Sequence, residues 1–410
     1  MKKITLIFAG IISVVNLNAQ VSDTVAIGAE NDVYYSLEND EVRTVERENW
    51  DIAFNLGGYG SAILARGASD VELYVYENGD ISDWETFDTN GLYGWEPRHN
   101  STETWSEGAF NRRDSSYSGW GNYSMQTHFT TADSLFLIKT TEGSYKKLWI
   151  DRLAHGVYYF KYADLNGSNE VSETVTKTDF TNKNYAYYSI DSQTELDREP
   201  ANDSWDLLFT KYTTMLSYGG AQMPYGVTGV LSNGGVEVNK VSGIHKLEVD
   251  TSDGSFSNSI STIGWDWKTH EGMGVYSTND SLTHFIKSKS GDVWKVNFTG
   301  YKGGSNGEFH FSKERILSVG TMQSIDVLEV SIFPNPVTDF VNIVFNQKEG
   351  GALQLNLYSL SGKLVQTKSL NETQAGINQQ NLNVSNLPTG MYVLSINSLH
   401  GKVQQTIIVK

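Results

Sequence analysis

The sequence of 410 residues contains no cysteine. This absence excludes disulfides, thiolate metal sites, cysteine nucleophiles and a lipid anchor on an amino-terminal cysteine. Basic residues are also scarce, and the net charge of −17 argues against a nucleic-acid partner, because an acidic surface repels phosphates. Beyond the amino terminus no apolar run approaches about 18 residues, so we expect no integral membrane segment.

Signs of catalysis are missing as well. No His-Glu-x-x-His pair occurs. Carboxylates are plentiful, but no spacing singles out one pair for acid–base work, and such pairs meet in space rather than in sequence. We therefore expect a protein that is not an enzyme.

The first twenty residues have the plan of a secretory signal peptide. Lys2 and Lys3 precede the apolar run Ile4–Val15, and small or polar residues follow at Asn16–Gln20. We expect residues 1–20 to direct export and to be cleaved after Ala19 or Gln20.

A set of short motifs occurs twice in the same order, with copies 145 to 155 residues apart. Trp50–Phe54 recurs as Trp205–Phe209, and a Tyr-Tyr-Ser precedes each copy, at Tyr34–Ser36 and Tyr187–Ser189. Further downstream the recurring pairs are Gly119-Trp120 and Gly264-Trp265, Asp133–Leu135 and Asp280–Leu282, and Ile138-Lys139 and Ile286-Lys287. Repetition in a constant order indicates a tandem duplication.

Both copies alternate with a period of two and carry many Asn-Gly turns, which predicts antiparallel β-structure. We expect an all-β fold with two tandem antiparallel β units, residues 21–170 and 171–322. Each unit is expected to begin its meander at the Trp-Asp motif. Trp50 and Trp205 are then equivalent core anchors, and Asp51 and Asp206 are turn or cross-strand partners.

Near Ser331 the composition changes, and short strands closed by turns predict a small Ig-like β-sandwich of about 80 residues. Its motifs are Pro334-Asn335-Pro336, the hairpin Leu357–Lys363, the strand Leu387–Tyr392 and the final Lys410. On these motifs residues 323–410 resemble the type A carboxy-terminal sorting domain of the type IX secretion system. The resemblance implies delivery through that machinery to the medium or the outer cell surface.

The body resembles the HmuY family of exported, all-β, haem-binding proteins of the Bacteroidetes. The matching residues are Trp50–Phe54, the Gly-Trp pairs and the Phe-Ile-Lys segment at 285–287. The resemblance covers two copies between about residues 30 and 315. The second copy, with Trp205–Phe209 and Pro224–Val230, is the closer match. The resemblance implies a haem cofactor and a surface or secreted binding protein.

Histidine and methionine recur between the copies. Aligning the Gly-Trp pairs places His99 against His245, Met125 against His270, and His128 against Met273. Imidazole and thioether are both competent axial ligands of haem iron. The candidate ligands are therefore His245 with His270 or Met273, and His99 with Met125 or His128. Arg112 and Arg113 are candidates for the haem propionates.

A second class of function is binding without haem. Trp84, Trp95, Trp105 and Trp120 lie in one polar stretch and either stack on sugars or fill a core. The alternative is therefore a non-haem surface adhesin or carbohydrate-binding protein that uses the same export route.

Overall fold

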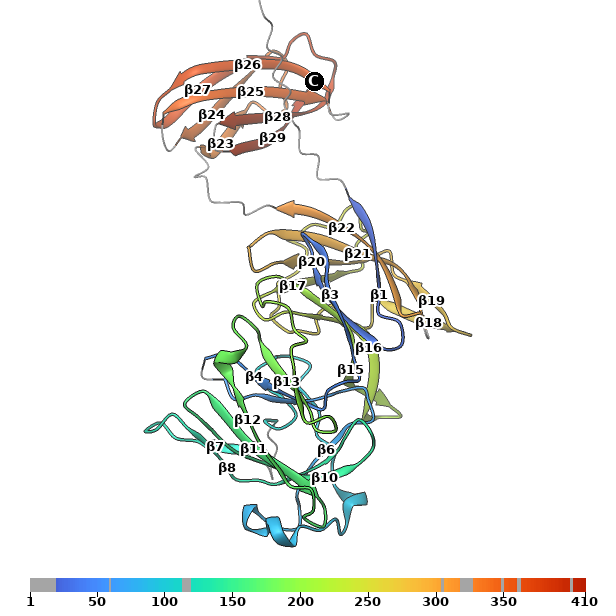
Figure 1. Ribbon diagram of the computed structural model, residues 1–410. Helices are drawn as coiled ribbons and strands as arrows, with labels where there is room; N and C mark the ends of the chain where they lie inside the picture. Colours follow the sequence, from blue (N-terminus) through green and yellow to red (C-terminus); the bar gives the residue numbers. More distant parts are fainter. Residues whose placement is uncertain are drawn as a thin grey trace, which may run out of the picture. The chain divides into compact units, whose positions relative to one another are not determined.

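The computed structural model describes residues 20–58, 60–112, 119–303, 306–317, 327–347, 350–359, 363–398 and 401–410. It confirms a nearly all-β, antiparallel protein, which divides into two compact units, Met1–Ser318 and Val319–Lys410 (Figure 1). We call them the body and the tail unit. Nearly all of the predicted signal peptide lies outside the described residues. No helix in the described ranges is both long and apolar enough to cross a membrane.

Two sheets of the body share one core and form what we call the first repeat. The larger sheet has the order β12-β11-β10-β9-β6, with β8 also paired with β10 and β7 paired with β8, and the smaller has the order β14-β13-β4-β5. The bounds are β4 (Ile52–Asn55), β5 (Ile63–Ala65), β6 (Glu72–Val75), β7 (Gly121–Tyr123), β8 (Thr130–Ala132), β9 (Phe136–Lys139), β10 (Tyr145–Ala154), β11 (Val157–Asp164), β12 (Val171–Thr176), β13 (Tyr185–Ser189) and β14 (Thr194–Leu196). The described part of this repeat also contains three short 3₁₀ helices, η1 (Ile81–Thr86), η2 (Leu92–Gly94) and η3 (Lys177–Asp179).

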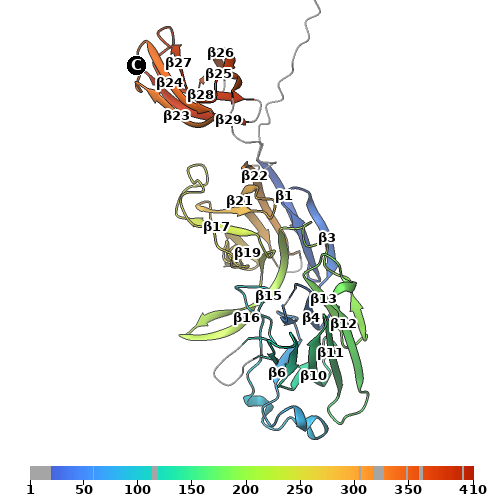
Figure 2. The ribbon, with the colours of Figure 1, turned by 90° about the vertical axis from the view of Figure 1, so that its left-hand side faces the viewer.

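The second repeat has the same plan, built from the remaining strands of the body. One sheet has the order β1-β22-β21-β20-β17 and the other β16-β15-β2-β3, and β18 and β19 form a separate hairpin. The bounds are β1 (Val21–Ala26), β2 (Asn31–Ser36), β3 (Asp40–Glu46), β15 (Leu207–Tyr218), β16 (Ala221–Ser232), β17 (Glu237–Ser242), β18 (Lys268–Gly272), β19 (Val275–Thr278), β20 (Leu282–Lys287), β21 (Val293–Lys302) and β22 (Glu308–Leu317). Figure 2 shows the long β15–β16 hairpin extending away from the rest of the body.

The strand pairing crosses between the copies. Strand β13, with the second Tyr-Tyr-Ser, pairs with β4 after the first Trp-Asp motif. Strand β2, with the first Tyr-Tyr-Ser, pairs with β15 after the second motif. The apolar cores agree: one runs from Ile52 to Ile190, and the other combines residues between Val25 and Leu37 with residues between Leu207 and Phe311.

The boundary predicted between the two β units, at residues 170 and 171, therefore does not coincide with the division of the body into its two apolar cores. Strands β1–β3 complete the second repeat, and β12–β14 complete the first. The physical reason is that ladder hydrogen bonds join backbone groups, which are the same in both copies. The sequence identifies the equivalent strands without specifying which copy each strand completes.

The Trp-Asp motifs hold the exchanged strands in place. The Asp51 carboxylate accepts hydrogen bonds from the Ile190 N–H at 2.7 Å and from the Thr141 N–H at 2.8 Å. The equivalent Asp206 accepts one from the Leu37 N–H at 2.8 Å. Ile190 and Leu37 each directly follow a Tyr-Tyr-Ser, so each aspartate fixes the end of a strand from the other copy. Burial raises the pKa of both aspartates, and the N–H donors oppose that shift.

Both tryptophans are buried, as expected, and each meets a tyrosine of the other copy edge-on. The ring centroids are 4.9 Å apart for Trp50 and Tyr187 and 5.0 Å apart for Trp205 and Tyr34. The Tyr34 and Tyr187 hydroxyls lie 3.3 Å apart. The equivalent residues Tyr34 and Tyr187 therefore contact each other where the two repeats meet.

The tail unit is a sandwich of two antiparallel sheets around one apolar core. One sheet has the order β23-β24-β27 and the other β26-β25-β28-β29. The bounds are β23 (Val327–Phe333), β24 (Phe340–Gln347), β25 (Gly351–Ser359), β26 (Leu364–Thr373), β27 (Gly376–Asn383), β28 (Gly390–Ser398) and β29 (Gly401–Val409). The two-sheet plan agrees with the expected sandwich, and its Ig-like topology stays a prediction.

The crossed pairing predicts which fragment folds alone. Residues 47–204 contain the whole core from Ile52 to Ile190 and should show cooperative urea unfolding with a β-sheet circular dichroism spectrum. Residues 21–170 lack β13, whose Ala186 and Tyr188 belong to that core, and should not. Cooperative unfolding of the second fragment, with none for the first, would contradict the crossed arrangement.

A buried histidine predicts a pH dependence of stability. His284 on β20 is fully buried, and neither ring nitrogen has a hydrogen-bond partner in the described ranges. Burial, followed by the charge of Lys240, lowers its pKa to about 3. The unfolded chain, with a histidine pKa near 6.5, binds the extra proton first as pH falls. Stability is therefore lost as pH falls below about 6.5.

The strand register supplies the matched variant. In the second repeat His284 on β20 pairs with Val296 on β21. At the equivalent place in the first repeat, Phe136 on β9 pairs with Leu148 on β10, so the first repeat has an apolar side chain where the second has His284. Between pH 7.5 and 5, His284→Leu should lose about 2 kcal/mol less stability than the parent chain in urea titrations. The exposed His245→Ala serves as the control. Equal losses for parent and His284→Leu would show that His284 is not the source.

Candidate functional site

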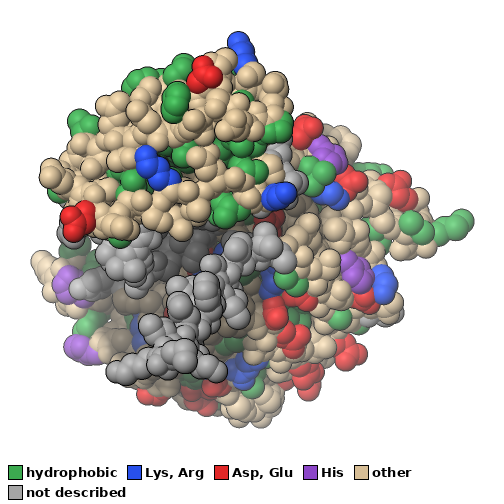
Figure 3. Space-filling model, turned by 90° about the horizontal axis from the view of Figure 1, so that it is seen from above, with side chains coloured by type: hydrophobic (Ala, Val, Ile, Leu, Met, Phe, Trp, Pro, Cys, Tyr) green, Lys and Arg blue, Asp and Glu red, His purple; other side chains and the backbone are tan. Residues whose placement is uncertain are grey.

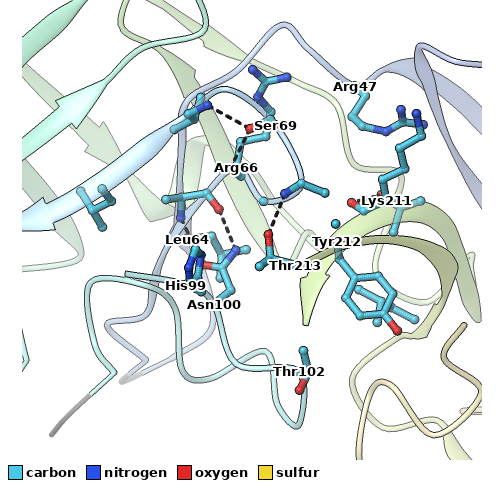
Figure 4. A pocket seen from close by; sticks show the side chains of 18 of the residues that line it. Arg47, Leu64, Arg66, Ser69, His99, Asn100, Thr102, Lys211, Tyr212 and Thr213 are labelled. Atoms are coloured by element: carbon cyan, nitrogen blue, oxygen red, sulfur yellow. Dashed lines mark hydrogen bonds between the residues drawn. The ribbon is translucent and has the colours of Figure 1, made fainter. Parts of the chain in front are cut away.

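A cavity of about 630 Å³ lies between the two repeats of the body. The first repeat contributes the segments 64–74 and 97–105, and the second contributes β2, the middle of β15 and part of β16. Figure 4 shows Arg66, His99 and Asn100 from the first repeat and Lys211, Tyr212 and Thr213 on β15 of the second. The cavity therefore exists only when both repeats are assembled.

Hydrogen bonds across the repeats close part of the wall. The Ala68 N–H donates to the Thr213 hydroxyl at 2.8 Å. The Trp105 indole N–H donates to the Ser232 carbonyl at 2.8 Å, and Trp105 packs in the apolar clusters of both repeats. These contacts hold the segments 66–70 and 101–105 against the second repeat.

One buried carboxylate anchors two of the cavity's arginines. Asp32 accepts from the Arg47 Nε at 3.0 Å, from the Arg198 Nη2 at 3.0 Å and from the Thr210 hydroxyl at 2.7 Å. Arg47 also donates to two backbone carbonyls of the second repeat. The guanidinium of Arg198 stacks over the rings of Tyr187 at 5.1 Å and Trp50 at 5.6 Å. Arg198 keeps an unpaired Nε in the described structure.

A third arginine has weaker partners. Arg66 directly follows β5, and its side chain donates from Nη2 to the Thr141 hydroxyl at 3.1 Å. The carboxylate nearest to Nη1 is Glu48, at 3.9 Å, and that side chain is 58% exposed. Neither Nε nor Nη1 of Arg66 makes a hydrogen bond to any described residue. Burial lowers the pKa of Arg66, so a nearby anion would favour its charged form.

His99 adds an imidazole to the same cavity. The neighbouring Asn100 fixes its segment, since the Asn100 amide donates to the Ala65 carbonyl at 2.7 Å and accepts from the Ala109 N–H at 2.9 Å. The His99 Nε2 is buried without a hydrogen-bond partner in the described structure. Burial, and then the charge of Arg112, lowers the pKa of His99, so the ring is neutral near pH 7.

The buried charges of this cavity do not balance. Arg47, Arg66 and Arg198 are 2%, 3% and 4% exposed, whereas Asp32, 6% exposed, is the buried carboxylate among the lining residues. On the described part of the face in Figure 3, by contrast, basic side chains are scattered singly among acidic ones. An acidic protein has therefore gathered cationic groups inside one cavity, where an unpaired charge is costly.

The six predicted haem ligands are distributed unevenly. His99 lines the cavity, and the other five do not. Met125 and His128 lie on the exposed turn between β7 and β8, and His270 and Met273 lie on the exposed β18–β19 hairpin. His245 is exposed and accepts from the Leu247 N–H at 3.3 Å. The predicted ligand pairs are therefore not assembled around this cavity. Of the propionate candidates, Arg113 lies outside the described residues.

The tryptophans of the polar stretch divide in a similar way. Trp84, Trp95 and Trp120 are buried in apolar clusters, as the core interpretation expects, whereas Trp105 lines the cavity. No group of three or more His, Asp or Glu side chains that could hold a metal ion occurs within the described ranges.

The candidate functional residues missed from the sequence are the three buried arginines. The available signal was position: Arg66 directly follows the apolar triplet Ile63–Ala65, where a charged side chain is unusual. The sequence could not predict that Arg66, Arg198 and Asp32 lie around one cavity, because they belong to different strands and loops.

Residues 331–410 match the family described as the secretion system C-terminal sorting domain. This match confirms the sorting domain predicted for residues 323–410. The chain is thus exported through the type IX secretion machinery and is secreted or attached to the cell surface. The resemblance of the body to the HmuY family stays a prediction.

Among curated proteins the chain is similar to "Ulvan lyase NLR42" from Nonlabens ulvanivorans, with 24% identity over 152 residues. The match covers 37% of this chain and about a quarter of the relative's length, at 24%. Among solved structures, dimeric latent PorU from Porphyromonas gingivalis aligns at 11% identity, covering 92% of this chain and 40% of that chain. Its TM-score is 0.18, too low to indicate a shared fold.

Proposed function

We propose that this exported protein binds a small anionic ligand in the cavity between its two repeats. The observation that carries the proposal is the imbalance of buried charge: three arginines against one aspartate. A buried charge is stable only when it is paired and hydrogen-bonded. Asp32 satisfies Arg47 and part of Arg198, which leaves Arg66 for the ligand.

The free donors indicate where the anion binds. Nε and Nη1 of Arg66, and Nε of Arg198, are buried without a hydrogen-bond acceptor in the described structure. Buried polar groups are normally hydrogen-bonded, and each missing bond costs about 1–3 kcal/mol. Carboxylate, sulfate and phosphate oxygens are the strongest acceptors for guanidinium donors. The aromatic side chains of Trp50, Trp105 and Tyr187 supply apolar walls for the remainder of the ligand.

Arg66 provides the test. We expect at least one anion among glucuronate, citrate, sulfate and phosphate to raise the melting temperature of the mature chain, because a ligand stabilises the state that binds it. Arg66→Met should weaken that binding by about tenfold or more, since a charge-assisted hydrogen bond contributes roughly 1.5–3 kcal/mol. Isothermal titration calorimetry measures the change in affinity.

Arg43→Met is the matched control, because Arg43 is partly exposed, pairs with Asp197 and does not line the cavity. It should bind as the parent does. The proposal fails if none of the four anions binds, or if Arg66→Met and Arg43→Met bind equally well.

Haem is a second candidate, favoured by one observation. His99 presents a buried, unpaired Nε2 on a neutral ring, which is the state that ligates iron. The residues present fit a haem held by one protein ligand: His99 would bind the iron, and Arg66 and Arg198 would meet the propionates. Haem would supply a redox-active iron centre. Ligation by His245, His270, Met273, Met125 or His128 would take place outside this cavity.

Haem titration separates the two ligand classes. If haem binds here, a sharp Soret band should appear with the mature chain, and it should shift or fade in His99→Ala, which removes the iron ligand. His245→Ala is the control and should leave the band unchanged. A band that responds to His245→Ala but not to His99→Ala would place haem elsewhere, and no band would exclude haem while leaving the anion proposal intact.

A further inference from the structure

A second recess lies on the outer face of the larger sheet of the first repeat, away from the cavity. Its volume is about 380 Å³, and its lining includes Trp149 and Asp151 of β10, Tyr159 and Lys161 of β11, and Thr174 of β12. Successive strand residues alternate between faces, so Leu148 and Ile150 fill the core while Trp149 points outward.

The second repeat contains the same sheet in the same register, which allows a comparison position by position. Trp149 pairs with Lys161 as Asn297 pairs with Ser312. Arg152 pairs with Tyr159 as Gly300 pairs with His310, and a bulge lies at the same place in both ladders. The comparison shows that the scaffold forms without Trp149, Tyr159 or Lys161.

In the second repeat, the side chain at the place of Trp149 has a structural role. The Asn297 amide donates to the Leu282 carbonyl at 3.1 Å and to the Thr283 hydroxyl at 2.7 Å, and it is buried. Trp149 is only partly buried: it packs against the apolar cluster that contains Trp84, and its indole Nε1 is shielded from solvent without a hydrogen-bond acceptor in the described structure. The part of the Trp149 ring that stays exposed lines the recess.

Neighbouring side chains orient the aromatic rings. The Lys161 ammonium lies 4.3 Å from the ring centroid of Trp84 and 5.2 Å from that of Trp149, which restricts the indole. The Arg152 guanidinium stacks on Tyr159 at 3.9 Å and pairs with Asp151. The rings are thus held in place before any ligand arrives, which lowers the entropic cost of binding.

We infer that this recess binds a glycan chain through Trp149 and Tyr159. The recess offers a donor in Lys161, an acceptor in Asp151 and a hydroxyl in Thr174. Sugar hydroxyls both donate and accept, whereas an anion or a cation would require one kind of partner only. Apolar C–H faces of a pyranose pack on aromatic rings, whose faces carry partial negative charge. The site is independent of the cavity and of the ligand proposed for it.

The test uses the residues of the second repeat as substitutions. The mature chain is run in native gels that contain hydroxyethylcellulose, xylan, glucomannan, laminarin or starch. At least one polysaccharide should retard it, and Trp149→Asn or Tyr159→His should weaken that binding about tenfold or more. Both substitutions should fold, because the second repeat places Asn297 and His310 at these positions. Lys161→Ser is a third variant of the same kind, and circular dichroism checks the fold of each.

Arg43→Met is the control and should be retarded like the parent, because Arg43 is partly exposed and lines neither the cavity nor the recess. Retardation by none of the five polysaccharides overturns the inference. Retardation that is equal in the parent, Trp149→Asn and Tyr159→His also overturns it, because the glycan would then bind elsewhere.

Discussion

The crossed pairing of the Tyr-Tyr-Ser strands with the Trp-Asp motifs is the constraint on which the body depends. Each motif places a buried aspartate against the N–H that ends the exchanged strand, as Asp51 does for Ile190 and Asp206 does for Leu37. A buried carboxylate is tolerated only with such donors. Removing a Tyr-Tyr-Ser strand would expose the core of its repeat and take away a donor of the buried aspartate, so each repeat depends on that strand.

This arrangement explains why the cavity lies where it does. The sheets that carry the exchanged strands turn one face to their own core and the other toward the opposite repeat, where Tyr34 and Tyr187 meet. Segments of both repeats surround the space beside this contact. Asp32, on an exchanged strand, positions Arg198 of the first repeat and Arg47 of the second, so the constraint that joins the repeats also orders the cationic wall.

Duplication has left two sheets with identical registers and different outer faces. The inward residues of β10 and β21 remain apolar, because both must fill a core. The outward residues are free of that requirement, and they differ: Trp149 in one repeat corresponds to Asn297 in the other. A duplicated β unit can thereby keep one architecture while its two outer faces carry different chemistry.

Much of the architecture was determined by the sequence itself. Period-two alternation and turn dipeptides require only neighbouring residues, and they predicted an all-β chain. The duplication, the equivalence of Trp50 and Trp205 and the sorting domain were readable because each is a linear pattern. The tertiary structure alone decided which copy each exchanged strand completes, because backbone hydrogen bonds do not distinguish the copies. It also decided that Arg66 and His99 share a cavity while Met125 and Met273, at 85% and 104% exposure, lie outside it. Convergence of distant side chains depends on how whole sheets pack, and no local spacing in the sequence carries that information.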